Sequence, residues 1–441
     1  MNTTKPLNPY FRKFRGRSTR KPLSASLNKS AQIEVTFNWV YILIAGAIIL
    51  LFFVGLVVKQ KAVSEERLAI DVVDIMDSIF TGASVSEKTK QPVDTSGLAD
   101  YTLFFDCSER VSEFGIKGQT ASEENAVQPL FAPHEIQTSR LLLWSLPYYL
   151  PYKVIDFLFV TSINTKYFIV GSDQEFISEF LNATEGFNIE YISAQDYLAI
   201  DPEGNYQVRI IDVSGTYNTQ PLPPKLAALD DNKVTMVAFL SNSNPSAYSG
   251  LSPERYPVQI NAPGGIFGAQ PSSLSTTSPT NGRKVNYYQK ENQAWQWLNL
   301  KEGPIQIISL GGEKDAAKYA AIFAADGEMY KCNMGKAFQR LQYLTEIYAG
   351  KDITRGLPGG KLKEMIDYYA TRPEEEALGE PCLDYLQVFD PHLSNSLMLF
   401  QNQVIVCQSG YQQCTELVST AEKIRQINQD LGRRGNCLTL Y

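Results

Sequence analysis

The sequence predicts an α/β protein with one N-terminal transmembrane helix that continues into a stalk. Three observations lead to this class. An uncharged, mainly apolar run lies near the N-terminus, between Val35 and Val58. Beyond it, short apolar runs alternate with segments of helical periodicity, which is typical of a sheet covered by helices. All six cysteines also lie beyond the run, which favours an oxidising compartment for that part of the chain.

Residues 32–58 are expected to form the transmembrane helix. From Trp39 to Val58 the run is almost wholly apolar, and a helix of about 20 residues covers roughly 30 Å, the thickness of a bilayer core. A cleaved signal peptide is the alternative, but its apolar core is typically only about 7–15 residues long. We therefore expect the segment to remain in the lipid bilayer as an anchor.

Charge is distributed unevenly along the 441 residues. The basic arm, residues 1–31, contains eight Lys or Arg and no acid, whereas Lys59, Lys61 and Arg67 are the cations that closely follow the apolar run. This bias predicts a single-pass protein of the cell membrane with a cytoplasmic N-terminus and residues 59–441 outside. Residues 59–441 contain 32 basic and 46 acidic residues, a net charge of −14. Such an acidic body disfavours nucleic acid as a partner.

Residues 59–98 are expected to form an amphipathic stalk and a linker. Apolar residues recur at helical spacing from Ala62 to Ile79, so the membrane helix should continue to about Phe80. The apolar stripe of the stalk requires a partner, which would be either the outer domain or a second copy of the chain.

Residues 99–326 are expected to form an α/β domain. Apolar residues 141–160 could suggest a second span, but Pro147 and Pro151 favour two core strands joined by a proline turn. A hairpin-like turn is expected at 162–165, and a flexible loop at 241–283 with one short strand at Tyr256–Ile260. Further strands are predicted at Tyr101–Phe105, Val154–Val160, Lys166–Val170, Phe187–Ile192, Tyr206–Val213, Val234–Leu240 and Pro304–Leu310, and helices at Ser172–Ala183 (capped by Ser172), Leu222–Leu229 and Glu313–Ala325.

Residues 327–441 are expected to be mostly helical and to contain cysteines. Periodicity predicts helices at Lys336–Tyr348 and Lys361–Ala370, and a last helix from Leu417 to Leu431. The apolar, partly β-branched run Met398–Cys407 predicts a strand instead.

The cysteines are candidates for disulfides, but six cysteines allow 15 pairings. Cys407 and Cys414 are near enough in sequence to close a short loop, and Cys382 and Cys437 flank the C-terminal region. There is no CxxC motif, so we expect no zinc site, no other metal and no cofactor. The disulfide candidates are Cys107, Cys332, Cys382, Cys407, Cys414 and Cys437.

The sequence contains no constellation typical of an enzyme. There is no GxSxG motif, and His134 and His392 are the only imidazoles. Asp212 lies in an apolar strand near its carboxyl end, where open α/β sheets bind ligands. Gly311 and Gly312 lie between a predicted strand and a helix, where backbone amides can bind an anion. These three residues are the ligand-site candidates, although an Asp that caps a turn and a tight strand-to-helix turn are the alternatives.

Two further positions are candidates for modification. The tripeptide that begins at Asn182 is an N-x-T sequon, which would carry a glycan on the outer side. The segment Lys29–Phe53, KSAQIEVTFNWVYILIAGAIILLFF, resembles the N-terminal region of archaeal type IV pilin-like membrane proteins, and is similar to the membrane segment of single-span archaeal proteins. The resemblance implies processing between Ala31 and Gln32. Ala replaces the usual Gly there, and the outer domain is larger than that of a typical pilin.

These observations favour a non-enzymatic surface protein with a structural or interaction role, which the resemblance would make pilin-like. Its partners would be the lipid bilayer, further copies of itself or other envelope proteins. The alternative is a ligand-binding outer domain, or an envelope enzyme, with a pocket near Asp212, Gly311 and Gly312 at the carboxyl ends of the strands.

Overall fold

The computed structural model describes the chain from Lys29 onward with several gaps, and the chain divides into two units, Met1–Glu65 and Glu66–Tyr441. One helix, α1 (Lys29–Val85), passes through the boundary between them. The described residues are 29–85, 90–204, 207–215, 221–241, 281–299, 303–312, 314–371, 382, 386, 393–409, 411, 414–433 and 437–441. The expected strand Tyr256–Ile260 and His392 lie outside these residues.

In the first unit, α1 matches the predicted apolar helix. Its side chains from Tyr41 to Val58 are exposed, apart from the half-exposed Ala45. In the described part of the chain this is the one helix long and apolar enough to cross a membrane. The helix ends at Val85, five residues beyond the predicted end at Phe80.

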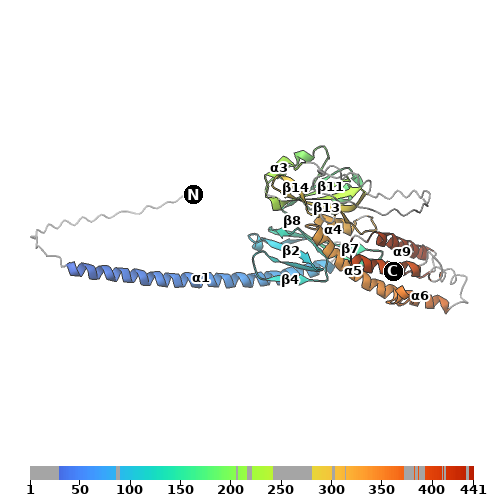
Figure 1. Ribbon diagram of the computed structural model, residues 1–441, viewed down its shortest axis with the longest axis horizontal. Helices are drawn as coiled ribbons and strands as arrows, with labels where there is room; N and C mark the ends of the chain where they lie inside the picture. Colours follow the sequence, from blue (N-terminus) through green and yellow to red (C-terminus); the bar gives the residue numbers. More distant parts are fainter. Residues whose placement is uncertain are drawn as a thin grey trace, which may run out of the picture. The chain divides into compact units, whose positions relative to one another are not determined.

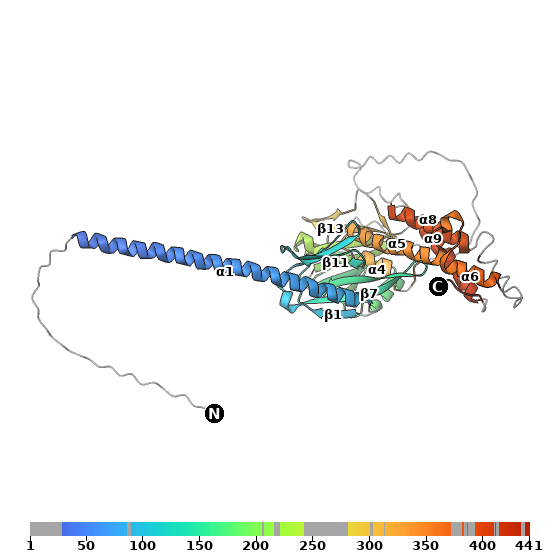
Figure 2. The ribbon, with the colours of Figure 1, turned by 90° about the horizontal axis from the view of Figure 1, so that it is seen from below.

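In the second unit, the end of α1 is part of the core. Phe80 packs against Phe105 and Phe114, with ring centroids 6.2 and 5.0 Å apart, and Figure 2 shows this end of the helix along the strands. The Glu66–Tyr441 unit itself therefore covers the apolar stripe of the stalk, and this unit was the first of the two expected partners. The buried stripe comprises Ala69, Val72, Val73, Met76, Phe80 and Ala83.

Two four-stranded sheets form the part of the unit next to this helix. β7 (Arg140–Tyr149) and β8 (Lys153–Ser162) are antiparallel and are joined at the cis peptide Leu150–Pro151, so the predicted proline turn is confirmed. Their sheet has the order β1-β7-β8-β5, with β1 (Lys90–Asp94) and β5 (Leu130–Phe131) at its edges. The other sheet has the order β4-β3-β2-β6, with strands β2 (Leu103–Ser108), β3 (Val111–Ile116), β4 (Ser122–Asn125) and β6 (Glu135–Ile136).

A seven-stranded mixed sheet follows, in the order β10-β9-β11-β12-β13-β14, with β15 beside β13. The first four strands are parallel, and β13 pairs antiparallel with its neighbours. The strands are β9 (Thr165–Val170), β10 (Ile189–Ile192), β11 (Gln207–Gly215), β12 (Val234–Ser241), β13 (Asn281–Glu291), β14 (Ala294–Trp297) and β15 (Ile305–Gln306).

Three local expectations for this region were wrong, and one hairpin was missed. β8 and β9 do not form a hairpin, because the chain changes sheet at residues 163–164. The hairpin of β13 and β14 was not predicted, since β13 begins inside the segment expected as a loop. Of the strand Pro304–Leu310, only β15 forms. Helix α2 (Gln174–Ala183) is capped by Asp173, whose carboxylate accepts a hydrogen bond from the Phe176 amide, rather than by Ser172.

Helices cover both faces of the seven-stranded sheet. On one face, α3 (Pro224–Ala227) contributes Leu226 to a small separate core. On the other face, α2 and the Ala-rich α4 (Ala316–Phe323) belong to the main core. Because α4 also contacts β7 and β8, it lies between two sheets, as Figure 1 shows.

The described elements beyond Ala325 are helical, as predicted. They are α5 (Gly327–Ala349), a 3-10 turn (Ile353–Arg355), α6 (Gly360–Ala370), α8 (Leu393–Ser409) and α9 (Thr415–Arg433). The strand expected at Met398–Cys407 was wrong, since the run lies within α8. Leu397, Phe400, Val404 and Cys407 are all buried, and their spacing is helical rather than alternating.

All six cysteines form disulfides, as expected. Cys107–Cys332 joins β2 to α5, over a sequence separation of 225 residues. The two pairs that sequence proximity and position suggested are also present, as Cys407–Cys414 and Cys382–Cys437. The helical C-terminal part is therefore linked covalently both to the sheets and within itself.

Candidate functional site

The carboxyl edge of the seven-stranded sheet is where the sequence placed a ligand site. Asp212 is buried near the end of β11, and its Oδ1 accepts a hydrogen bond of 2.9 Å from the Ser214 amide. The strand order places β10 on one side of β9 and β11 on the other. This reversal creates a topological switch point at the carboxyl ends of β9 and β11.

Gly311 and Gly312 belong to a turn that is held by the first residues of α4. Both have positive φ, 73° and 114°. The Gly311 amide donates to Ser309 Oγ at 2.9 Å, and Ser309 Oγ lies 2.7 Å from Asp315 Oδ2. Asp315 also accepts from the backbone amides at the start of α4. The helix terminus that was expected to bind an anion is thus already capped by a carboxylate, and neither glycine lines the cavity described below.

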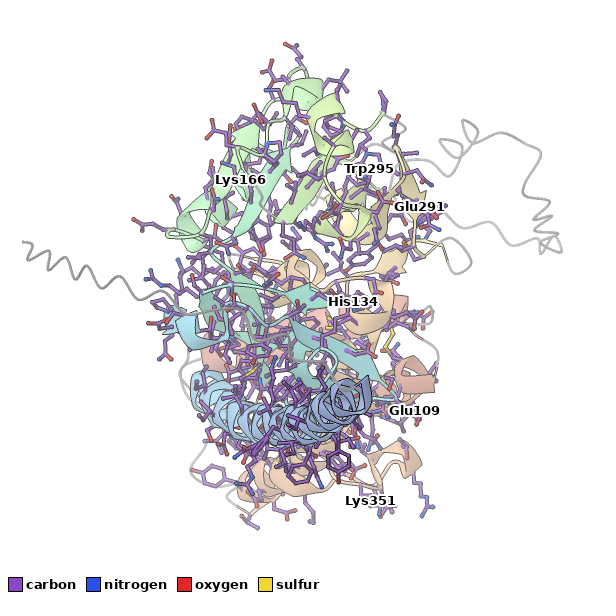
Figure 3. The ribbon with its side chains drawn as sticks, turned by 90° about the vertical axis from the view of Figure 1, so that its left-hand side faces the viewer. Glu109, His134, Lys166, Glu291, Trp295 and Lys351 are labelled. Atoms are coloured by element: carbon purple, nitrogen blue, oxygen red, sulfur yellow. A yellow bond between two sulfur atoms is a disulfide. The ribbon has the colours of Figure 1, made fainter. Side chains whose placement is uncertain are left out.

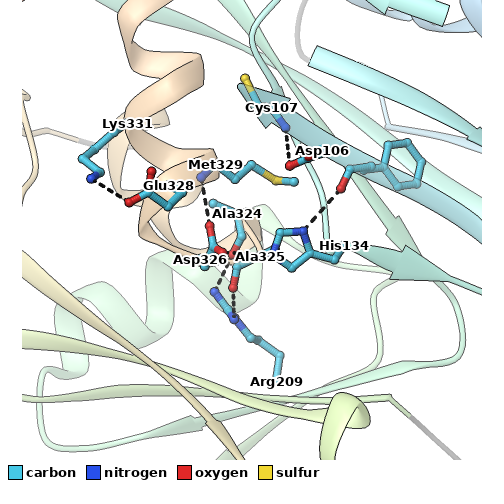
Figure 4. A network of polar contacts seen from close by, with 11 residues as sticks. Asp106, Cys107, His134, Arg209, Ala324, Ala325, Asp326, Glu328, Met329 and Lys331 are labelled. Atoms are coloured by element: carbon cyan, nitrogen blue, oxygen red, sulfur yellow. Dashed lines mark hydrogen bonds and ion pairs between the residues drawn. The ribbon is translucent and has the colours of Figure 1, made fainter. Parts of the chain in front are cut away.

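A different group of polar residues meets at the opposite edge, at the junction of α4 and α5. His134 follows β5, and Figure 3 marks its place in the fold. Its Nε2 lies 2.9 Å from Asp326 Oδ2, and Figure 4 shows the two residues from close by. Asp326 is the N-cap of α5, since its Oδ1 accepts from the Met329 amide at 2.9 Å. The hydrogen bond with Asp326 raises the pKa of His134. Burial opposes ionisation of Asp326, but the hydrogen bonds from His134 and Met329 leave its pKa below the ordinary value.

Arg209, on β11, binds the other side of this junction. Its guanidinium donates to the carbonyls of Ile322, Ala324 and Ala325 at 3.1, 2.6 and 3.2 Å. Figure 4 shows Arg209 beside Ala324 and Ala325, and the guanidinium also lies over the Tyr287 ring. These carbonyls lie at the end of α4, where helical partners are lacking. Burial lowers the pKa of Arg209, but an arginine remains charged in proteins, and the negative end of the helix dipole stabilises that charge.

A cavity of about 290 Å³ adjoins these residues at the amino ends of β9, β11 and β12. Its floor is a row of register partners on four adjacent strands, Tyr167, Arg209, Thr235 and Gln289. Register partners point to the same face of a sheet, which here is the face toward α4. The end of α4, from Ile322 to Ala325, forms the opposite wall, and His134 lies at one side.

A second buried cation, Lys336 on α5, lies outside this cavity. Its Nζ donates to Ser112 Oγ, Asn125 O and Gln128 O at 2.6, 2.7 and 3.1 Å. Burial lowers the pKa of Lys336 to about 7. In the described part of the chain its ammonium has neutral oxygens as acceptors and no carboxylate partner.

Sequence reasoning did not select Arg209, Asp326 or Lys336. Arg209 could have been found from its place in the apolar strand VRIIDV, because an arginine buried in such a strand requires hydrogen-bond acceptors. Apart from the Met329 amide, which is local to Asp326, the hydrogen-bond partners named above for these side chains lie more than a hundred positions away in sequence. No local pattern therefore identifies these contacts.

The modification candidates lie in separate places. Asn182 is exposed on α2, whereas the hydroxyl of Thr184, the third sequon residue, is buried and donates to the Phe180 carbonyl. Ala31 and Gln32 lie near the start of α1. Among the described residues, no group of three or more His, Cys, Asp or Glu is arranged to hold a metal ion.

Comparison of the chain with models of protein families, with curated proteins and with solved structures finds no match.

Proposed function

We propose that the chain is a single-pass membrane protein whose Glu66–Tyr441 unit lies outside the cell as a structural or interaction module. The observation that carries this proposal is the exposed apolar helix in a chain whose six cysteines, all beyond that helix, are paired. Disulfides persist in oxidising compartments, and the cationic arm predicts a cytoplasmic N-terminus.

The residues at the junction of α4 and α5 support a role that is not catalytic. His134 contacts the N-cap of α5, and Arg209 contacts the end of α4. Both side chains thus hold elements of the fold in place. A general base would need a lone pair free for the substrate, whereas both His134 nitrogens face protein oxygens, at 2.9 and 3.4 Å.

Site-directed labelling tests the topology. Thr19→Cys places a thiol in the basic arm, and Glu203→Cys places one at an exposed position of the second unit. A membrane-impermeant maleimide should label Glu203→Cys in intact cells and Thr19→Cys only after lysis. Labelling in the reverse pattern would place the disulfide-bearing unit in the cytoplasm and overturn the proposal.

The pilin-like form of this proposal depends on processing at Ala31–Gln32. The intact mass and N-terminal sequence of protein extracted from native membranes test it directly. A chain that begins at Gln32 supports a filament role, because leader removal is what the resemblance implies. A chain that begins at Met1 or Asn2 leaves the module as a plain anchored protein.

A second candidate function is ligand binding at the carboxyl edge, which the switch point between β9 and β11 favours. Asp212 is the residue to test. If the edge binds ligands, Asp212→Asn should abolish thermal shifts that a compound screen finds with the wild-type chain. Asp230→Asn is the control, since Asp230 is an exposed carboxylate. Thermal shifts that survive in Asp212→Asn would remove this candidate.

A further inference from the structure

The cavity between the end of α4 and the amino ends of β9, β11 and β12 contains two polar side chains on its floor that have unused hydrogen-bonding capacity. Thr235 and Gln289 are register partners on β12 and β13, and both are half-buried. Within the described part of the chain, neither the Thr235 hydroxyl nor the Gln289 amide has a hydrogen-bond partner. Together they offer a hydroxyl, a carbonyl oxygen and an NH₂ group along one line of the floor.

The charged groups that line the same cavity are already compensated. Arg209 donates to the carbonyls at the end of α4, and His134 pairs with Asp326. Glu135 pairs with Lys117, whose Nζ lies 2.6 Å from Glu135 Oε1. A charged ligand would therefore lose its hydration without gaining a counter-ion in the cavity, which is unfavourable.

The Tyr167 ring on the floor and the opposite wall at the end of α4 are apolar and partly aromatic. Tyr167 and Phe323 meet edge to face, with centroids 5.7 Å apart, and the Tyr167 hydroxyl is bonded to Thr161. Ala324 and Ala325 continue this wall. At about 290 Å³ the cavity is close to the lower limit for small-molecule sites, whose volumes are roughly 300–1,000 Å³.

We propose that this cavity binds a small uncharged molecule that has one hydrogen-bonding edge and one apolar face. Thr235 and Gln289 bind the polar edge. The Tyr167 ring on the floor, together with Phe323 and the rest of the wall at the end of α4, contacts the apolar face. This site lies at the edge of the sheet opposite Asp212, and its occupancy does not depend on the surface role proposed above.

Three probes of similar size and different charge test the proposal with the full chain in lipid nanodiscs. They are benzamide, benzoate and benzylamine, added at pH 7.5 and followed by ligand-observed NMR, with empty nanodiscs as the background. Benzamide should bind saturably, and the two charged probes should bind at least about tenfold more weakly, since neither finds a free counter-ion. Absence of saturable benzamide binding, or equal binding of benzoate, would overturn the proposal.

Variants then locate the binding. Gln289→Leu and Thr235→Val each remove a hydrogen-bonding group, and each should weaken benzamide binding about three- to tenfold. Gln296→Leu is the matched control, because Gln296 continues the same row on β14, is exposed and does not line the cavity. An equal effect of Gln289→Leu and Gln296→Leu would overturn the assignment. The comparison of the neutral and charged probes on the wild-type chain tests the proposal even if a variant fails to fold.

Discussion

Arg209 and Ala324 lie 115 residues apart in sequence, and an N–H···O hydrogen bond of 2.6 Å joins the guanidinium of one to the carbonyl of the other. Ala324 is the C-cap residue of α4. The bond therefore connects the seven-stranded sheet to a helix that also packs on β7 and β8. Together with the contact between His134 and Asp326, it fixes the junction from which α5 begins.

Arg209→Met should destabilise the second unit strongly. Methionine retains most of the side-chain volume but leaves the buried carbonyls at the end of α4 without donors. The free energy of unfolding, measured by denaturant unfolding, should fall by about 3 kcal/mol. Arg355→Met, at an exposed ion pair, should change it by less than about 0.5 kcal/mol. Similar losses in the two variants would contradict the capping role.

The contact between His134 and Asp326 should make stability depend on pH in a defined direction. The pKa of folded His134 is raised above its ordinary 6.5, so its contribution is complete below pH 6.5 and is lost as pH rises through the raised value. The pKa of folded Asp326 is lowered below its ordinary 3.8, so its contribution is present above pH 3.8 and is lost at more acidic pH. Both contributions are therefore present together between these limits.

Two variants test this pH window. His134→Gln should reduce the free energy of unfolding more at pH 5.5 than at pH 8.5. The difference between the two losses should be under about 1 kcal/mol, because the imidazole is half-exposed. Asp326→Asn removes the charge but can still cap α5, and it should abolish most of the same pH dependence. If both variants keep the wild-type profile between pH 5.5 and 8.5, another group titrates there.

Lys336 should make the stability of the fold rise with pH in the alkaline range, which is the opposite of the effect expected for His134. Because its pKa is about 7 in the folded protein and 10.5 ordinarily, the unfolded chain binds more protons between these values, and stability rises with pH. From pH 7.5 to 9 the gain should be on the order of 1–2 kcal/mol. Lys336→Met should remove this gain, whereas Lys361→Met, at an exposed position of α6, should retain it. If the stability of both variants depends on pH in the same way, Lys336 does not titrate in this range.

The elements that sequence predicts well are those whose signals are local. β11, β12 and α9 appear near their expected positions, because continuous apolar runs and a helical stripe depend only on neighbouring residues. The prediction at α8 was wrong because burial on one face of a helix outweighs the strand preference of the β-branched residues near Cys407. The predicted hairpin of β8 and β9 was wrong because the sheet that each strand joins depends on pairing partners that are distant in sequence.

The same limit applies to the candidate site. Asp212 was selected for a local reason, its place in an apolar strand. The cavity instead arises where β9, β11, β12 and β13 align with the end of α4. Thr235 and Gln289 carry no signal of their own, since their alignment depends on strand register across a long insertion.

Phe80 tests whether the apolar stripe of the stalk belongs to its own domain. Its ring is buried against Phe105 and Phe114, so Phe80→Ala should cost about 3–5 kcal/mol of unfolding free energy. Ile75→Ala is the control on the same helix, because Ile75 is 59% exposed. Contacts within one chain are independent of protein concentration, whereas an interface between copies is not. The lowered Tm of Phe80→Ala should therefore be the same at dilute and concentrated protein, and a Tm that recovers with concentration would assign the stripe to an interface between copies.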